Sequence, residues 1–151
     1  MDIHRDENSP VQGEFVDIKS EAYYKISHAD QMPPFFIRVI SDNNHWLFAS
    51  STGGLTAGRV SPDTALFPYE TVDKLHLSGN HTGPKTIVRV RDAGRTRCWE
   101  PFNTEHRRRF PIRRNLYKNK LGNKLCFEEI NEEFGLAFRY TWSTSAAFAG
   151  E

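Results

Sequence analysis

The chain has 151 residues, a formal net charge of +1 and 38% hydrophobic residues, which suits one globular domain with a buried core. No apolar run approaches the ~20 residues of a membrane-spanning helix. The charged start, residues 1–7, lacks the apolar stretch of a signal peptide. These features argue against membrane insertion and export, and they predict a cytoplasmic protein.

Two cysteines, Cys98 and Cys126, have no Cys-x-x-Cys partner and make no disulfide framework, which favours a reducing compartment. Both alternate with residues of expected strands, so we predict two small buried hydrophobic side chains. Aromatic residues make up 13% of the chain, and together with the many β-branched residues they favour strands.

Residues 1–12 are polar and are expected to form a flexible segment. Short apolar or alternating runs then predict strands, because each is bounded by turn-forming residues. In the first part of the chain these runs are 14–18, 22–26, 35–40 and 46–50. The turn at 41–44 is rich in Asp and Asn, so the last two strands are expected to pair antiparallel.

The second part of the chain continues this pattern, with alternation at 72–77 and expected strands at 86–91, 96–100, 107–117, 124–130 and 134–143. Pro111 would confine its strand to a sheet edge or a bulge, because proline cannot donate to the ladder. The last run is the clearest, since every second residue from Phe134 to Trp142 is large and apolar. This period of two predicts a strand with one buried face.

Short strands with turns between them, and no helical period, predict an all-β fold: a two-sheet antiparallel β-sandwich rather than a barrel or an α/β fold. Residues 13–151 are expected to form a single β-sandwich domain that continues beyond the C-terminus in a longer chain. The apolar strand 134–143 lies close to the end of the sequence. We therefore expect either that it sits inside a sheet or that residues 146–151 begin another element.

The glycine-rich stretch 52–59 follows an apolar strand. Gly53 and Gly58 have the spacing of a phosphate-binding Walker A loop. Arg59 and Val60, however, occupy the Lys and Ser/Thr positions, and no helical pattern follows. The stretch therefore predicts a corner from strand to loop, with glycine serving the backbone geometry.

No metal-ligand or nucleophile motif is present in the sequence, so we expect no metal, no cofactor and no catalytic residue. Two carboxylate pairs, Glu128-Glu129 and Glu132-Glu133, could suggest glycoside chemistry. Neighbours on a strand point to opposite faces, however. Both pairs are therefore interpreted as solvated charges beside a turn.

A basic run at 107–124 carries eight Arg and Lys residues. Such a run could bind nucleic-acid phosphates, whereas alternating basic residues on an edge strand would block pairing with another chain. The near-neutral net charge of the chain favours the second interpretation. We expect neither nucleic acid nor a membrane as a partner, although the sequence does not say whether the run has another partner.

Aromatic residues next to charged ones occur at 69–74 and 99–102. Sugar-binding surfaces use such groups, with a ring against the sugar face and polar groups for its hydroxyls. The alternative is that Tyr69 and Trp99 only pack in the core or at its rim.

A family resemblance rests on three runs that follow one another in the chain: Ser50-Ser51-Thr52-Gly53-Gly54…Arg59, then Arg89-Val90-Arg91-Asp92, then Gly94…Trp99-Glu100-Pro101. Over about residues 46–102 the chain resembles the N-terminal β-sandwich of the cellobiose and chitobiose phosphorylase family. It looks like a large relative rather than a true cellobiose phosphorylase, since 58–73 departs from the family pattern. The resemblance implies a galactose-mutarotase-like supersandwich followed by a helical linker and an (α/α)6 catalytic barrel. The family's catalytic acid belongs to that barrel.

The sequence therefore predicts a non-catalytic β-sandwich module of a carbohydrate-active, glycoside-phosphorylase-like enzyme. A free-standing sugar-binding or protein-interaction β-sandwich is the alternative. Ligand contacts are expected at loops bearing Arg59, Asp73, Lys74 and Trp99. The expected partners are a carbohydrate and a downstream helical catalytic domain, and a homodimer stays open.

Overall fold

The computed structural model of the chain describes residues 10–41, 43–92 and 94–144. Their strands are β1 (Gln12–Ile18), β2 (Glu21–Ser27), β3 (Phe36–Val39), β4 (His45–Ser50), β5 (Leu55–Arg59), β6 (Val88–Asp92), β7 (Arg95–Trp99), β8 (Ile112–Asn119), β9 (Lys124–Asn131) and β10 (Leu136–Ser143). The helical elements are α1 (Val72–Leu77) and the short 3-10 helices η1 (Ala29–Gln31), η2 (Pro62–Thr64) and η3 (Glu105–Arg108).

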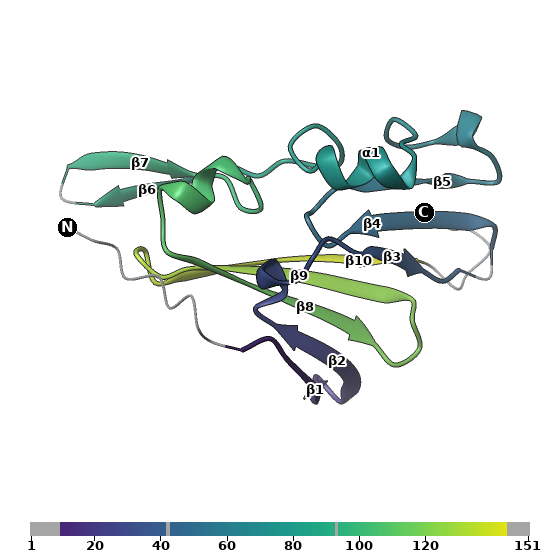
Figure 1. The fold of residues 1–151 in the computed structure, drawn as a ribbon, viewed down its shortest axis with the longest axis horizontal. Helices are drawn as coiled ribbons and strands as arrows, with labels where there is room; N and C mark the ends of the chain where they lie inside the picture. The colour runs from purple at the N-terminus through teal and green to yellow at the C-terminus, as the bar shows by residue number, and fades with distance from the viewer. Residues whose placement is uncertain (1–9, 42, 93, 145–151) are drawn as a thin grey trace.

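The strands form a five-stranded sheet in the order β1-β2-β8-β9-β10, a three-stranded sheet β3-β4-β5 and the hairpin β6-β7. Neighbouring strands are antiparallel in each of them. Figure 1 shows the three-stranded sheet and the hairpin on the same side of the five-stranded sheet, towards opposite ends of the long axis. The predicted all-β, sandwich-like architecture is confirmed.

The main core lies between the two larger sheets. Val39, Leu47 and Leu55 come from the three-stranded sheet, and Leu125 and Phe127 come from β9. β3 buries every second side chain, as a strand with one covered face does, whereas β9 is buried on both of its faces. A second cluster of Tyr23, Tyr117 and Cys126 lies on the opposite face of the five-stranded sheet, with Val16 and Ile18 packed against it.

The last strand confirms the period of two but not the expected position inside a sheet. Trp142 is buried, Phe138 and Tyr140 are half-buried, and Leu136 is exposed. β10 pairs with β9 and lies at the edge of the five-stranded sheet. The alternative, an element beginning at 146–151, lies outside the described residues, as do residues 1–9 of the expected flexible segment.

The glycine-rich stretch is a hairpin turn and not a corner into a loop. Gly53 has φ +99°, and β5 begins at Leu55 and pairs with β4. A Cβ on Gly54 would lie 2.1 Å from the carbonyl oxygen of Leu75, so only glycine allows α1 this close to the turn. β5 was missed because Thr56, Ala57 and Gly58 have too little bulk for an apolar strand signal.

The alternating run 72–77 forms helix α1 and not a strand. Leu75 is fully buried and anchors the helix, whereas Leu77 is 85% exposed. Asp73 lies in the first turn, and Lys74 and His76 lie in the last turn. This charge order suits the helix dipole and stabilises even a six-residue helix that one side chain holds in place.

The basic run 107–117 is also divided differently from the prediction. η3 covers its beginning, and β8 starts only after Pro111. The proline therefore costs no ladder hydrogen bond, and its carbonyl oxygen accepts from the backbone N–H of Glu132 at 3.0 Å. β8 lies between β2 and β9, so the expectation of a basic edge strand is wrong.

A buried carboxylate joins the hairpin to the five-stranded sheet. Glu129 is fully buried on the core face of β9. Its carboxylate accepts from Arg114 Nε, Trp99 Nε1 and the backbone N–H of Phe102, each at 2.8 Å. The expectation that Glu128 and Glu129 are solvated is thus wrong, because Glu128 is buried too. Each has donors that balance the cost of burying a charge.

We predict that Glu129→Ala lowers the free energy of unfolding by about 3–5 kcal/mol, because Arg114 is left as an unpaired buried charge. Glu133→Ala is the matched control. Glu133 pairs with Arg97 at a partly exposed position, and loss of such a pair costs about 0–1 kcal/mol. Urea unfolding followed by circular dichroism measures both variants, and equal losses would contradict a dominant role for Glu129.

Candidate functional site

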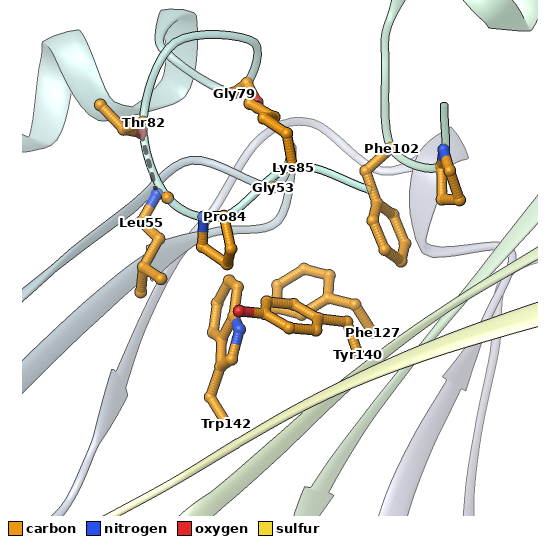
Figure 2. Close-up of a pocket in the computed structure, with 12 residues that line it drawn as sticks. Gly53, Leu55, Gly79, Thr82, Pro84, Lys85, Phe102, Phe127, Tyr140 and Trp142 are labelled. Carbon is orange, nitrogen blue, oxygen red and sulfur yellow. Dashed lines mark hydrogen bonds between the residues drawn. The ribbon is translucent and has the colours of Figure 1, made fainter. Parts of the chain in front are cut away.

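A small cavity lies where the Gly53 turn, the loop 79–85 and the turn after β7 meet the core face of β9 and β10. Phe127, Tyr140 and Trp142 form its floor, and Phe102 forms one side. Figure 2 shows these rings grouped below the loop that carries Pro84 and Lys85. The cavity therefore has aromatic walls on one side and backbone with polar side chains on the other.

The aromatic walls are held by ring contacts. The rings of Phe127 and Trp142 have centroids 4.8 Å apart, and Tyr140 meets Trp142 edge-on at 5.3 Å. Phe102 packs edge-on against Phe127 at 6.0 Å. Such tilted and edge-on pairs are favourable arrangements for aromatic quadrupoles. The floor is therefore preorganised by packing alone.

Trp142 carries the one unusual polar group of this cavity. Its side chain is 8% exposed, and its indole Nε1–H has no hydrogen-bond partner among the described residues. A buried N–H without a partner costs roughly 1–3 kcal/mol. A hydrogen-bond acceptor within reach of this N–H would remove this cost.

The neighbouring polar groups are already engaged. Thr82 Oγ1 donates to the carbonyl of Ser78 and accepts from the backbone N–H of Leu55, both at 3.2 Å. The ammonium group of Lys85 donates to the carbonyl of Gly79. Burial lowers the pKa of Lys85, against the opposing effect of Glu100.

The enclosed space measures about 30 Å³. A water molecule needs roughly 10–15 Å³ of such space and two or more polar partners. The cavity therefore accommodates one or two waters, or a single hydroxyl or hydroxymethyl group of a larger ligand. It does not enclose a sugar ring.

The four residues predicted to contact a ligand do not line this cavity. Arg59, at the end of β5, is exposed, and so are Asp73 and Lys74 on α1. A hydrogen bond from Thr71 holds the pKa of Asp73 below its ordinary value. Trp99 is 1% exposed and bound to Glu129, so its ring is part of the core. The ligand contact at these residues stays a prediction.

A serine–histidine pair that the sequence reasoning missed lies under α1. Ser50 Oγ is 2.7 Å from His76 Nδ1 and 2.7 Å from Thr52 Oγ1, and Thr52 also donates to the carbonyl of His76. Ser50 is fully buried. A substrate cannot reach a buried hydroxyl, so this pair holds α1 against the end of β4.

Glu128 forms a separate polar cluster on the opposite face of the sheet. Its carboxylate accepts from Asn115 Nδ2 at 2.7 Å, Tyr117 Oη at 2.9 Å and Arg139 Nε at 2.6 Å. Burial alone would raise the pKa of Glu128, but these donors outweigh it and the pKa lies below its ordinary value. The two adjacent carboxylates thus face opposite sides of β9, which agrees with the strand argument.

Cys98 and Cys126 differ in environment. Cys126 is buried, as predicted, and burial raises the pKa of its thiol. Cys98 is exposed on β7, so the prediction of a buried side chain is wrong there. The error arises because the hairpin has only one covered face, and Cys98 lies on the other one.

None of the helices in the described ranges is long and apolar enough to cross a membrane. Within the same ranges, no three His, Cys, Asp or Glu side chains gather where they could share a metal ion. The chain matches no protein-family model, and no curated protein matches it significantly. The phosphorylase resemblance therefore stays a prediction.

Replacement of the two buried tryptophans by phenylalanine should have unequal effects. Trp99→Phe and Trp142→Phe remove a similar packing volume, but only Trp99→Phe removes a hydrogen bond to a buried carboxylate. We expect Trp99→Phe to cost roughly 1–3 kcal/mol more in unfolding free energy. Urea unfolding followed by far-ultraviolet circular dichroism measures the unfolding free energy of both variants. An equal loss of unfolding free energy in the two would contradict an unpaired Trp142 N–H.

Glu128 should contribute to stability in a pH-dependent way. Its folded pKa lies below the ordinary 4.5, so its contribution is present above that pH and is lost as the pH falls through the folded value. We predict that Glu128→Gln destabilises the protein near neutral pH, and that the difference from wild type shrinks on acidification. Unfolding free energies measured over a pH series test this. The control, Glu132→Gln, alters an exposed residue and should keep the wild-type slope.

Proposed function

We propose that this chain is the non-catalytic N-terminal β-sandwich module of a carbohydrate-active, glycoside-phosphorylase-like enzyme. One observation supports this most. Two of the runs on which the family resemblance rests, the Gly53-Gly54 turn and the segment Trp99-Glu100-Pro101, meet at the aromatic cavity. Gly53, Pro101 and Phe102 all line it, and a Cβ on Gly53 would lie 3.5 Å from Phe102 Cβ.

The cavity chemistry suits a neutral carbohydrate. Aromatic rings offer apolar surface to the C–H face of a sugar, and polar groups at their rim take its hydroxyls. Trp142, which lines the cavity, has an N–H donor without a partner among the described residues, and Lys85 adds a positive charge to the lining. A hydroxyl or hydroxymethyl group of the sugar would enter the cavity, while the sugar ring stays outside it. The module therefore positions or binds carbohydrate, and a downstream helical domain supplies catalysis.

Binding can be followed at the indole N–H groups of the three tryptophans by nuclear magnetic resonance. On addition of cellobiose or chitobiose, the Trp142 signal should shift, because an acceptor replaces the unpaired state, while the buried, hydrogen-bonded Trp99 signal stays. Trp142→Phe assigns the signal and should weaken binding. Trp46→Phe, a change in the three-stranded sheet outside the cavity, is the control.

Two results would contradict the proposal. One is phosphorolysis of a disaccharide by the purified chain that a point mutation abolishes, since the module is proposed to be non-catalytic. The other is the absence of any shift with either sugar. The alternative is a free-standing sugar-binding or protein-interaction β-sandwich. The coding sequence beyond Glu151 distinguishes the two, because the proposed enzyme requires a helical domain there.

A further inference from the structure

Positive charge is concentrated in one segment of the chain. Residues 85–114 contain ten Lys and Arg against three Asp and Glu, a net charge of +7, whereas the whole chain carries +1. Four of these arginines pair with carboxylates, namely Arg97, Arg107, Arg113 and Arg114. Arg89, Arg91, Arg95, Arg108 and Arg109 are exposed and have no carboxylate partner among the described residues.

The hairpin β6-β7 presents two of the unpaired arginines side by side. Its register places Arg91 opposite Thr96 and Arg89 opposite Cys98. All four side chains are exposed, whereas Trp99, on the other face of the hairpin, is buried towards the five-stranded sheet. Among the strands of the described ranges, β6 and β7 pair only with each other, and they lie at one end of the molecule (Figure 1). This outer face is thus open to a ligand.

Arg89, Arg91 and Thr96 line a shallow hollow of about 410 Å³. Same-face neighbours on a strand are about 7 Å apart, so two long arginine side chains can reach one group between them. A guanidinium presents its donors as a fork that matches the oxygens of a carboxylate or sulfate. Thr96 adds a hydroxyl on the same face. The hollow therefore has the donors for one acidic group and no acidic side chain in its lining.

We propose that the outer face of the β6-β7 hairpin binds an acidic group, a carboxylate or a sulfate ester, of a saccharide. The saccharide part of this inference rests on the proposed carbohydrate function. The inference narrows the ligand class to acidic sugars and assigns their recognition to the hairpin. The aromatic cavity takes no part in it.

A saccharide is favoured over nucleic acid by the composition of this face. Single-stranded nucleic acid is bound by aromatic rings on which bases stack, and the outer-face residues Arg89, Arg91, Thr96 and Cys98 include no aromatic ring. Nucleic-acid-binding domains are also strongly basic as a whole, whereas the residues outside 85–114 carry a net charge of −6. Arg89, Arg91 and Thr96 together line one hollow, which offers donors for a single acidic group.

Calorimetric titration with four probes tests the inference: oligogalacturonate, a sulfated oligosaccharide, a neutral cello-oligosaccharide and a short DNA duplex. At least one acidic saccharide should bind, with an affinity that falls as salt rises. The double variant Arg89→Ala/Arg91→Ala should weaken it about tenfold or more. Arg38→Ala/Lys120→Ala removes the same charge from exposed positions outside the hairpin and should leave the affinity within about twofold.

Cys98 supplies a second readout at the site itself. It lies opposite Arg89 and is exposed, whereas Cys126 is buried. A bound saccharide should therefore slow alkylation of Cys98 by iodoacetamide in the wild-type protein. The arginine double variant should lose this protection at the same ligand concentration.

The outcomes separate the two proposals. Binding of the neutral oligosaccharide without either acidic one overturns the hairpin inference and leaves the proposed function standing. Failure of all saccharides overturns both. If the DNA duplex binds as tightly as the acidic saccharides, the face is a nucleic-acid or general polyanion surface. If both double variants lose the same amount of affinity for the acidic saccharide, the hairpin is not the binding site. Either result overturns the inference.

Discussion

The buried carboxylate of Glu129 is the interaction on which the arrangement of this molecule depends. It accepts three hydrogen bonds from two other segments of the chain: from Trp99 and the backbone of Phe102 at and just after the end of β7, and from Arg114 in β8. Removing a charge from water is costly unless each oxygen finds donors. The three donors must therefore stay together. The hairpin β6-β7 has no strand pairing to either larger sheet, so this network is its main polar attachment to the five-stranded sheet.

The same network shapes the aromatic cavity. Glu129 holds the backbone of Phe102, whose ring then packs against Phe127 on the cavity wall. On the other side, the close approach of Gly54 to Leu75 keeps α1 against the turn, and Ser50 and His76 add a hydrogen bond. Two independent contacts thus fix the surroundings of the cavity: an ionic one holds the Phe102 turn against β9, and a steric one holds α1 against the Gly53 turn.

The sequence predicted the parts that depend on near neighbours. Strand alternation, the antiparallel pairs and the all-β fold follow from period-two patterns such as that ending at Trp142. The prediction from sequence failed where a residue's environment is determined by residues far away in the chain. Glu129 is buried because its donors come from positions 15 and 30 residues away, and α1 forms because Leu75 meets a buried site. The unpaired N–H of Trp142 has no sequence signal, since a tryptophan on an apolar strand face is expected to pack.

The cavity and the basic hairpin face share one structural segment. β7 carries Thr96 on its outer face and ends at Trp99, which Glu129 binds, and the next residues are Pro101 and Phe102 of the cavity. A ligand that moved the hairpin would therefore act on Trp99 and, through Glu129, on Phe102. Packed interiors transmit such shifts because they contain few voids. A saccharide at the hairpin and a hydroxyl in the cavity would thus be bound by two surfaces whose relative position is fixed by one buried carboxylate.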